Sequence, residues 1–394
     1  MKKLNINTGT ALLLNERSAA LEGYDRININ CGNAVISRKV NSRLLELGVS
    51  INSGNMSVID ISGELVEVAP NTVITSRSSF NGCFVFCNGN LIIEDAGGLA
   101  DITGLYAESV FHPESVNLNR VRGITATRRI VYADDAKLHI GDLTLGDDAY
   151  ITLDGTLHWI YGCVRALDSG VVRKLREKHA SFTCRKLITY EGIYENNADM
   201  FRADTFVLIP DGYAYAGDIT LDASSAALYG DKLYIEGDLM IAHDQTSHLS
   251  DFEALIVKGT ATMPIGAIKD FKCCGNADDY CLYAGILMTV NGKDTFSHEH
   301  LQTVIKRGVT YTIHVNGVLE FCDDVTAEDI AAITAIHCNG VIRAPRSVRG
   351  ELDSRIREMN GLLQDIGNTD EQNDTTHDEA DDAVTNLNSG VYRL

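Results

Sequence analysis

Apolar residues alternate with polar residues around a central glycine at many points along this chain. The pattern reads apolar-x-apolar-x-Gly-x-apolar-x-apolar, and it is clearest around Gly237, Gly259 and Gly317. Alternation with a period of two is typical of a β-strand that buries one face. Recurrence of such a strand at intervals of about twenty to twenty-five residues indicates a solenoid. The sequence therefore predicts a β-solenoid of stacked parallel strands over residues 1–345.

Three N-terminal units carry a variant of this pattern. Their glycines are Gly9, Gly32 and Gly54, and the apolar positions before each glycine have the opposite parity to those after it. A strand keeps both sets of residues on one face only if it bends between them. Because glycine tolerates a positive φ, we expect these units to turn a corner at their Asn-x-Gly sequences.

Short segments with helical spacing lie between several strands. Each continues into a strand so that the apolar residues follow the order L-x-x-L-x-x-L-x-L, as in residues 21–29, 249–257 and 330–338. In this order the chain resembles the leucine-rich-repeat family, whose units are 20 to 29 residues long. The resemblance implies short helices in some of the repeats. Residues from about 100 to 160 lack these segments and resemble a plain parallel β-helix.

Three segments depart from the repeat. Residues 165–186 form a basic insertion, for which we expect a helix that projects from the solenoid. Residues 346–366 place apolar side chains at every third or fourth position, which predicts an amphipathic helix that caps the C-terminal end of the solenoid. Residues 367–394 contain many acids and few apolar residues, and this composition predicts a disordered tail.

Composition narrows the classes of function. The formal net charge of -20 at pH 7 argues against binding to nucleic acid or to anionic membranes. No stretch approaches the roughly eighteen apolar residues that a membrane helix requires. The 10 cysteines form no compact, regular framework, so we expect reduced thiols and a cytoplasmic protein. The sequence contains neither G-x-x-x-x-G-K-[ST] nor G-x-G-x-x-G, and we expect no cofactor.

Two sets of residues have side chains of the kind that bind metals or catalyse hydrolysis. Residue types that zinc prefers lie in one stretch, at Cys273, Cys274, Cys281, His298 and His300, but their spacing fits no recognised zinc finger. Acidic pairs at 134–135, 147–148, 278–279 and 323–324 match the ligands of calcium and the carboxylates of carbohydrate-active enzymes. Aspartate is equally common in turns between strands, and we favour that role. We therefore assign no metal site and no catalytic residue.

The histidines form no recognisable catalytic set either. Four of them occupy strand positions next to the predicted inward residues, so we expect them on an outer face: His139, His158, His314 and His337. None has a serine or cysteine partner at a spacing that indicates a nucleophilic triad.

The best candidate for a functional surface is electrostatic. Basic residues cluster in two short stretches of this acidic chain and form a candidate surface for an anionic partner: Arg120, Arg122, Arg128, Arg129, Arg173, Lys174, Arg176 and Lys178. A cluster of this kind focuses a positive potential if its members are neighbours in the fold. The alternative is a set of solvated faces that nearby acids balance.

These observations favour a non-enzymatic protein-interaction or scaffold protein. Stacked repeats present a long surface whose outward residues vary without disturbing the core, and binding of a protein partner is the usual role of such surfaces. Two alternatives stay open, namely a carbohydrate-active β-helix enzyme and a structural protein that self-assembles into homo-oligomers. The enzyme requires converging carboxylates with shifted pKa values in a concave site.

Overall fold

The chain folds into parallel β-strands joined by short helices. The computed structural model describes residues 2–15, 21, 23–121, 123–366 and 384–393. Within these residues the strands form six sheets, and paired strands run parallel to one another. The predicted parallel strands with short helices between them are confirmed.

The first two sheets contain the N-terminal third of the chain and one C-terminal strand. The first has the order β28-β1-β2-β3, formed by β28 (Val384–Arg393), β1 (Lys3–Leu13), β2 (Arg26–Ser37) and β3 (Ser50–Ile59). The second has the order β4-β6-β7-β8 with β5 beside β6, formed by β4 (Glu64–Val68), β5 (Thr72–Ile74), β6 (Cys83–Ile93), β7 (Gly104–Pro113) and β8 (Ile124–Tyr132). Helix α1 (Arg38–Glu46) connects β2 to β3.

The central two sheets carry most of the helices. The third sheet is formed by β9 (Ala136–Ile140), β10 (Leu143–Thr144), β11 (Leu157–Ala166), β12 (Ser181–Tyr190) and β13 (Phe201–Ile209). The fourth is formed by β14 (Ala214–Ala216), β15 (Ile219–Leu221), β16 (Lys232–Ile235), β17 (Leu239–Ile241), β18 (Ala254–Pro264) and β19 (Gly275–Tyr283). Their helices are α2 (Asp147–Thr152), α3 (Ser169–Glu177), α4 (Glu191–Asn197), α5 (Ser225–Tyr229) and α6 (Ile268–Cys274).

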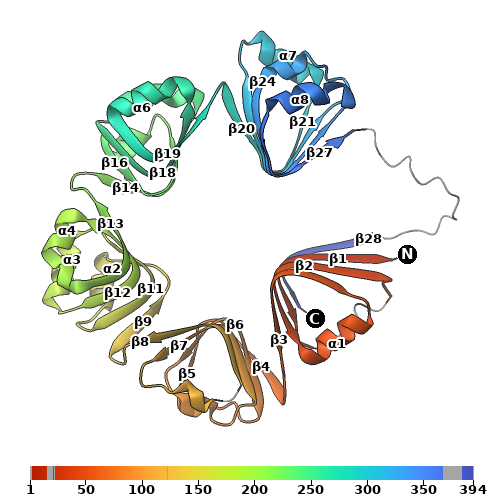
Figure 1. The fold of residues 1–394 in the computed structure, drawn as a ribbon. Coiled ribbons are helices and arrows are strands. Elements are labelled where there is room, and N and C mark those ends of the chain that lie inside the picture. The colour runs from red at the N-terminus through yellow and green to blue at the C-terminus, as the bar shows by residue number, and fades with distance from the viewer. Residues whose placement is uncertain (1, 16–20, 22, 122, 367–383, 394) are drawn as a thin grey trace.

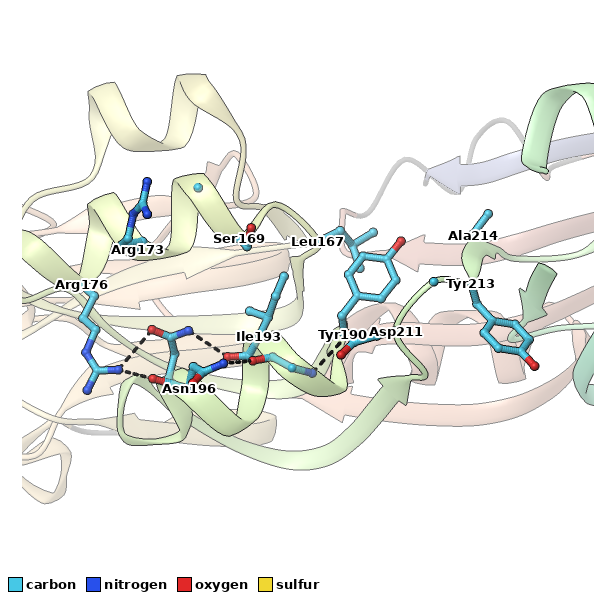
Figure 2. Close-up of a pocket in the computed structure, with 14 residues that line it drawn as sticks. Leu167, Ser169, Arg173, Arg176, Tyr190, Ile193, Asn196, Asp211, Tyr213 and Ala214 are labelled. Carbon is cyan, nitrogen blue, oxygen red and sulfur yellow. Dashed lines mark hydrogen bonds between the residues drawn. The ribbon is translucent and has the colours of Figure 1, made fainter. Parts of the chain in front are cut away.

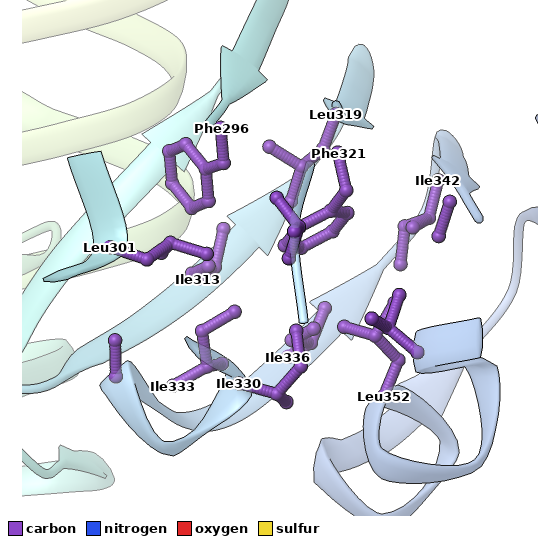
Figure 3. Packing of buried hydrophobic residues seen from close by; sticks show 14 of the residues in the cluster. Phe296, Leu301, Ile313, Leu319, Phe321, Ile330, Ile333, Ile336, Ile342 and Leu352 are labelled. Carbon is purple, nitrogen blue, oxygen red and sulfur yellow. The ribbon is translucent and has the colours of Figure 1, made fainter. Parts of the chain in front are cut away.

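The last two sheets enclose a single core. One is formed by β20 (Ile286–Val290), β22 (Tyr311–Val315), β24 (Ile333–Cys338) and β26 (Ile356–Met359), and the other by β21 (Lys293–Phe296), β23 (Val318–Phe321), β25 (Val341–Ala344) and β27 (Leu362–Asp365). Buried residues of both sheets pack with helices α7 (His298–Lys306) and α8 (Arg349–Arg355) (Figure 3). No helix among the described residues is both long and apolar enough to cross a membrane.

Short 3-10 helices occupy many of the remaining connections. They are η2 (Ala96–Leu99), η3 (Leu118–Arg120), η4 (Ala198–Met200), η5 (His243–Asp251), η6 (Ile265–Ala267), η7 (Asp329–Ala332) and η8 (Arg346–Val348). Figure 1 shows the groups of strands following one another along an open curve, with α3, α4, α6 and α7 on its outer side. Strand β28 returns across the opening of this curve to lie beside β1 (Figure 1).

The N-terminal strands change parity at their glycines, as the sequence predicts. Leu4 and Ile6, before Gly9, belong to the same core cluster as Ala11 and Leu13, after it. Gly9, Gly32 and Gly54 nevertheless lack the expected positive φ. Close approach explains them instead, because a Cβ on Gly9 would lie 2.9 Å from the Gly390 carbonyl oxygen. The glycines therefore allow neighbouring strands to stack.

The predicted capping helix at residues 346–366 is wrong in its second half. Helix α8 ends at Arg355, and the chain continues as β26 and β27. These strands pair in parallel with β24 and β25. The apolar spacing of residues 346–366 is compatible both with one helix and with a short helix followed by two strands. Pairing with the edges of β24 and β25 gives hydrogen-bond partners to backbone groups of these strands that a longer helix would leave unpaired.

The predicted disordered tail contains a strand. Residues 384–393 form β28, which pairs with β1. Their Asn-x-Asn-x-Gly sequence repeats that of β1, and this match outweighs the polar composition of the segment. The rest of the predicted tail, residues 367–383 and 394, lies outside the described residues.

Residues 165–186 are continuous with the strands around them. Arg165 lies in β11 and Lys186 lies in β12, and these strands pair with each other. The helix between them, α3, buries Val171, Val172 and Leu175 in the core cluster. Helix α3 therefore packs against the sheet, and its basic residues lie away from this core cluster.

Candidate functional site

A hollow near the predicted basic residues lies between α3, α4 and the turn that leads into β14 (Figure 2). Its volume is about 920 Å³. Its lining includes Arg173, Arg176, Tyr190, Asn196, Asp211 and Tyr213. We call it the α3–α4 hollow. Volumes of about 300–1,000 Å³ are typical of ligand pockets.

Helix α3 positions the two arginines. Asp168 caps the helix by accepting hydrogen bonds from the backbone N–H groups of Gly170 and Val171, at 2.8 and 3.0 Å. Because residues three apart share a face of a helix, Arg173 and Arg176 lie side by side on the face away from the core. The helix ends just before His179, which has a positive φ of 63°.

Arg176 is held by α4 and η4. Its guanidinium donates to the Asn197 Oδ1 at 3.2 Å and to the backbone carbonyl of Asn196. It also forms an ion pair with Asp199, with a shortest distance of 3.1 Å. Figure 2 shows the bonds to Asn196 and Asn197 on the α4 side of the hollow. Arg176 therefore joins α3 to α4 and has little capacity left for a ligand.

Arg173 differs from Arg176 in having no hydrogen bond or ion pair within the described parts of the chain. Its side chain is exposed and lines the hollow. Asp211, another lining residue, accepts a hydrogen bond from the backbone N–H of Gly192 at 3.3 Å. Arg173 therefore supplies the positive charge that is available to a ligand.

Two tyrosines also line the hollow and add aromatic surface to it. Tyr190 ends β12, and Tyr213 lies in the turn before β14. Both are partly buried and pack against a core cluster that includes Ile188 and Ile209. Rings fixed in this way offer contact area at a small cost in conformational entropy.

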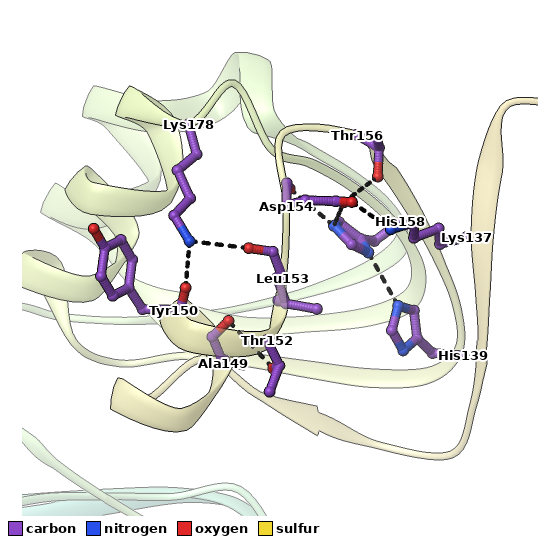
Figure 4. A network of polar contacts seen from close by, with 10 residues as sticks. All are labelled: Lys137, His139, Ala149, Tyr150, Thr152, Leu153, Asp154, Thr156, His158 and Lys178. Carbon is purple, nitrogen blue, oxygen red and sulfur yellow. Dashed lines mark hydrogen bonds and ion pairs between the residues drawn. The ribbon is translucent and has the colours of Figure 1, made fainter.

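The remaining basic residues of α3 face helix α2. Lys178 donates from Nζ to the carbonyl oxygens of Tyr150 and Leu153, at 2.5 and 3.1 Å (Figure 4). Its Nζ also lies 4.1 Å from the centre of the Tyr150 ring, and the Nζ of Lys174 lies 5.4 Å from the same centre. Cation–π contacts of this kind stabilise the packing of α2 on α3.

The arginines of β8 belong to another sheet and do not join the hollow. Arg128 donates to the Tyr161 hydroxyl at 3.2 Å, and Arg129 donates to the Ile124 carbonyl at 3.3 Å. Arg122 and the side chain of Arg120 lie outside the described parts of the chain. Of the predicted set, the structure places only Arg173 and Arg176 in one hollow.

A polar network next to α2 includes a histidine predicted to face outward (Figure 4). His158 is 1% exposed, so that prediction is wrong for this residue. Its Nδ1 shares a hydrogen bond of 3.0 Å with the His139 Nε2, and its Nε2 lies 3.2 Å from the carbonyl oxygen of Asp154. Burial is the main reason that the pKa of His139 is lowered, and the neighbouring His158 lowers it further. Hydrogen bonds from Lys137 and Thr156 hold the pKa of Asp154 at about 2.

The residues considered for zinc are dispersed. Cys273 and Cys274 lie on α6, Cys281 on β19, and His298 on α7. His298 instead contacts the buried carboxylate of Asp329, with Nδ1 2.8 Å from Oδ2. Within the described ranges, no three or more His, Cys, Asp and Glu side chains gather closely enough to hold a metal ion.

The acidic pairs bind backbone groups. Asp134 accepts from the Ser115 N–H at 2.8 Å, Asp279 from the Tyr280 N–H at 2.8 Å, and Asp324 from the His298 N–H at 3.3 Å. The contacts of Asp134 and Asp324 match the role in turns that aspartate commonly has, because both residues lie between strands. Asp279 instead lies within β19 and bonds to the next residue of that strand.

Sequence reasoning located the two arginines of the hollow but missed its tyrosines. Tyr190 is the last residue of β12 and Tyr213 lies in the turn after β13, and neither stands in a motif that would single it out. Comparison of the chain with protein-family models, with curated proteins and with solved structures found no match.

Proposed function

We propose that this chain is a non-enzymatic protein-interaction or scaffold protein and that the α3–α4 hollow binds an acidic segment of a partner. The observation that carries the proposal is that Arg173, which no described residue pairs with, lies in a hollow lined by two partly buried tyrosines. Arginine and tyrosine are enriched among the residues that dominate protein–protein binding energy. An acidic side chain of the partner would pair with the Arg173 guanidinium.

The arrangement of strands supports a scaffold role. Asparagines of successive strands form ladders, such as Asn316 to Asn291 at 3.0 Å and Asn360 to Asn339 at 3.1 Å. With parallel pairing throughout each sheet, these ladders favour the β-solenoid interpretation of the chain. A scaffold of this kind holds a binding site on rigid elements.

A carbohydrate-active enzyme is less well supported. Glycoside hydrolysis usually requires two carboxylates about 5 to 9.5 Å apart on either side of the bond that is cleaved. Among the residues that line the α3–α4 hollow, Asp211 alone has a carboxylate. Asp134, Asp279 and Asp324 bind backbone N–H groups instead.

Affinity capture with three forms of the chain tests the proposed function. Wild type, Arg173→Glu and Arg357→Glu are used in parallel on extract from the native cell, and bound proteins are identified by mass spectrometry. Arg357 lies exposed on β26, so its reversal is a matched control for net charge. We expect a partner that binds wild type and Arg357→Glu, with at least tenfold weaker capture by Arg173→Glu, or about 1.4 kcal/mol. Equal capture by all three forms, or no specific partner, would contradict the proposal.

A further inference from the structure

Strand β28 adds a fourth strand to the N-terminal sheet from the opposite end of the sequence. It pairs in register with β1, from Lys3 opposite Val384 to Leu12 opposite Arg393. The side-chain amides continue this register, with Asn5 donating to Asn386 at 3.1 Å and Asn7 donating to Asn388 at 3.0 Å. Backbone and side chains therefore specify the same alignment.

The sequence of β28 matches that of the strands it joins. Asn388 continues a ladder that runs through Asn7, Asn30 and Asn52. The bonds from Asn30 to Asn7 and from Asn52 to Asn30 are each 2.9 Å long. Gly390 stands opposite Gly9, and a Cβ on Gly9 would lie 2.9 Å from the Gly390 carbonyl oxygen. The outer edge of β1 is therefore a specific acceptor for a strand with this motif.

Within the described residues, few contacts other than those with β1 hold β28 in place. It is the end strand of its sheet, and Leu387 and Val391 are 43% and 47% exposed. Its other described contacts are the packing of Tyr392 against the N-terminal core and an ion pair of 2.6 Å between Arg393 and Glu67. A strand held at one edge separates at a lower free energy than the whole protein unfolds.

Separation would leave β1 as an unpaired edge. Leu4 and Ile6 of β1 are buried, and its backbone groups on this side bond to β28. An open edge of this kind is a template for another strand. Every copy of the chain carries the same donor and the same acceptor, so transfer between copies rebuilds identical contacts.

We propose that β28 is a donor strand which a second copy of this chain accepts on its β1 edge. Donor and acceptor are different surfaces, so the contact is heterologous and links copies head to tail. The two arrangements contain the same bonds, and protein concentration therefore decides between pairing within a chain and pairing between chains. This assembly is independent of the α3–α4 hollow.

Disulfide trapping tests the exchange. Chains that carry only Asn7→Cys are mixed with chains that carry only Asn388→Cys, and both are oxidised after incubation at high concentration. Register partners on adjacent strands lie about 5 Å apart, within the Cα separation that a disulfide spans. We expect a covalent dimer whose linkage maps to positions 7 and 388, several-fold more abundant than in a mixture of Asn7→Cys with the out-of-register Asn386→Cys.

The double variant Asn7→Cys/Asn388→Cys provides the reference for pairing within one chain. Each single variant incubated alone controls for linkages to the native cysteines. Crosslinking within the double variant without any dimer in the mixture of single variants would overturn the proposal. Failure of the double variant to crosslink would overturn it as well, because the pairing itself would then be absent.

Discussion

At the residue scale, glycine and asparagine determine how closely the strands stack. Glycines of the C-terminal sheets follow one another in the same way as those near the N-terminus, and a Cβ on Gly317 or Gly340 would collide with the backbone of the preceding glycine. The adjacent asparagines bond to one another along the stack. The sequence predicts the positions of these residues, but their contact with the same residue type one strand away depends on register, which no single strand reveals.

Replacement of Gly317 by alanine tests this role. The added methyl group would overlap the Gly292 carbonyl oxygen, so β22 and β23 must shift away from the preceding strands. We expect a loss of about 2 kcal/mol or more in the free energy of unfolding, measured by urea denaturation. Gly266 has no atom within 4 Å of such a methyl group, and Gly266→Ala is the matched control. Equal stability of the two variants would exclude close approach as the reason for glycine at position 317.

At the element scale, hydrophobic periodicity gives the type of most elements but not their ends. Residues 346–366 show the difficulty, because the same apolar positions serve α8 and then the two strands that follow. His158 shows a second one, since it lies on the same face of β11 as the buried Ile160 and its ring stacks on that of Phe182 in the neighbouring strand, with ring centres 5.5 Å apart. Both errors arise where a neighbouring element decides the environment of a segment.

A buried carboxylate on η7 holds this element to α7. Asp329 is fully buried and accepts hydrogen bonds from Gln302 at 2.7 Å and from the backbone N–H of Thr326 at 2.7 Å. Burial alone would raise the pKa of Asp329, but the bonds from Gln302, Thr326 and His298 outweigh burial and hold the pKa at about 2. The ionised form is therefore the one that stabilises the fold.

Asp329→Asn should lower the free energy of unfolding by about 2 kcal/mol at pH 7, because a pKa shift of this size corresponds to that energy. The folded pKa lies below the ordinary value of 3.8, so the stabilisation is complete above that value and is lost as the pH falls toward 2. Urea denaturation at a series of pH values measures both effects. Asp323→Asn, at an exposed position between β23 and η7, should change the free energy of unfolding little. A variant as stable as wild type at pH 7 would show that Asp329 does not hold α7 to η7.

At the scale of the whole molecule, local patterns predict the parallel strands, while two long-range features escape them. The first is the return of β28 to β1, which joins the two ends of the chain. The second is the α3–α4 hollow, whose lining comes from α3, α4 and the turn before β14. Two of the eight predicted basic residues meet there, because only these two lie on the face of α3 toward α4.

Hydrogen exchange of the chain with and without its captured partner tests the central claim most directly. If the α3–α4 hollow binds the partner, backbone amides of residues 169–197 and 210–214 should exchange more slowly in the complex. Those of β22 to β25 should keep their rates, since these strands lie in other sheets. Protection confined to β22–β25, or no change at α3 and α4, would contradict the account.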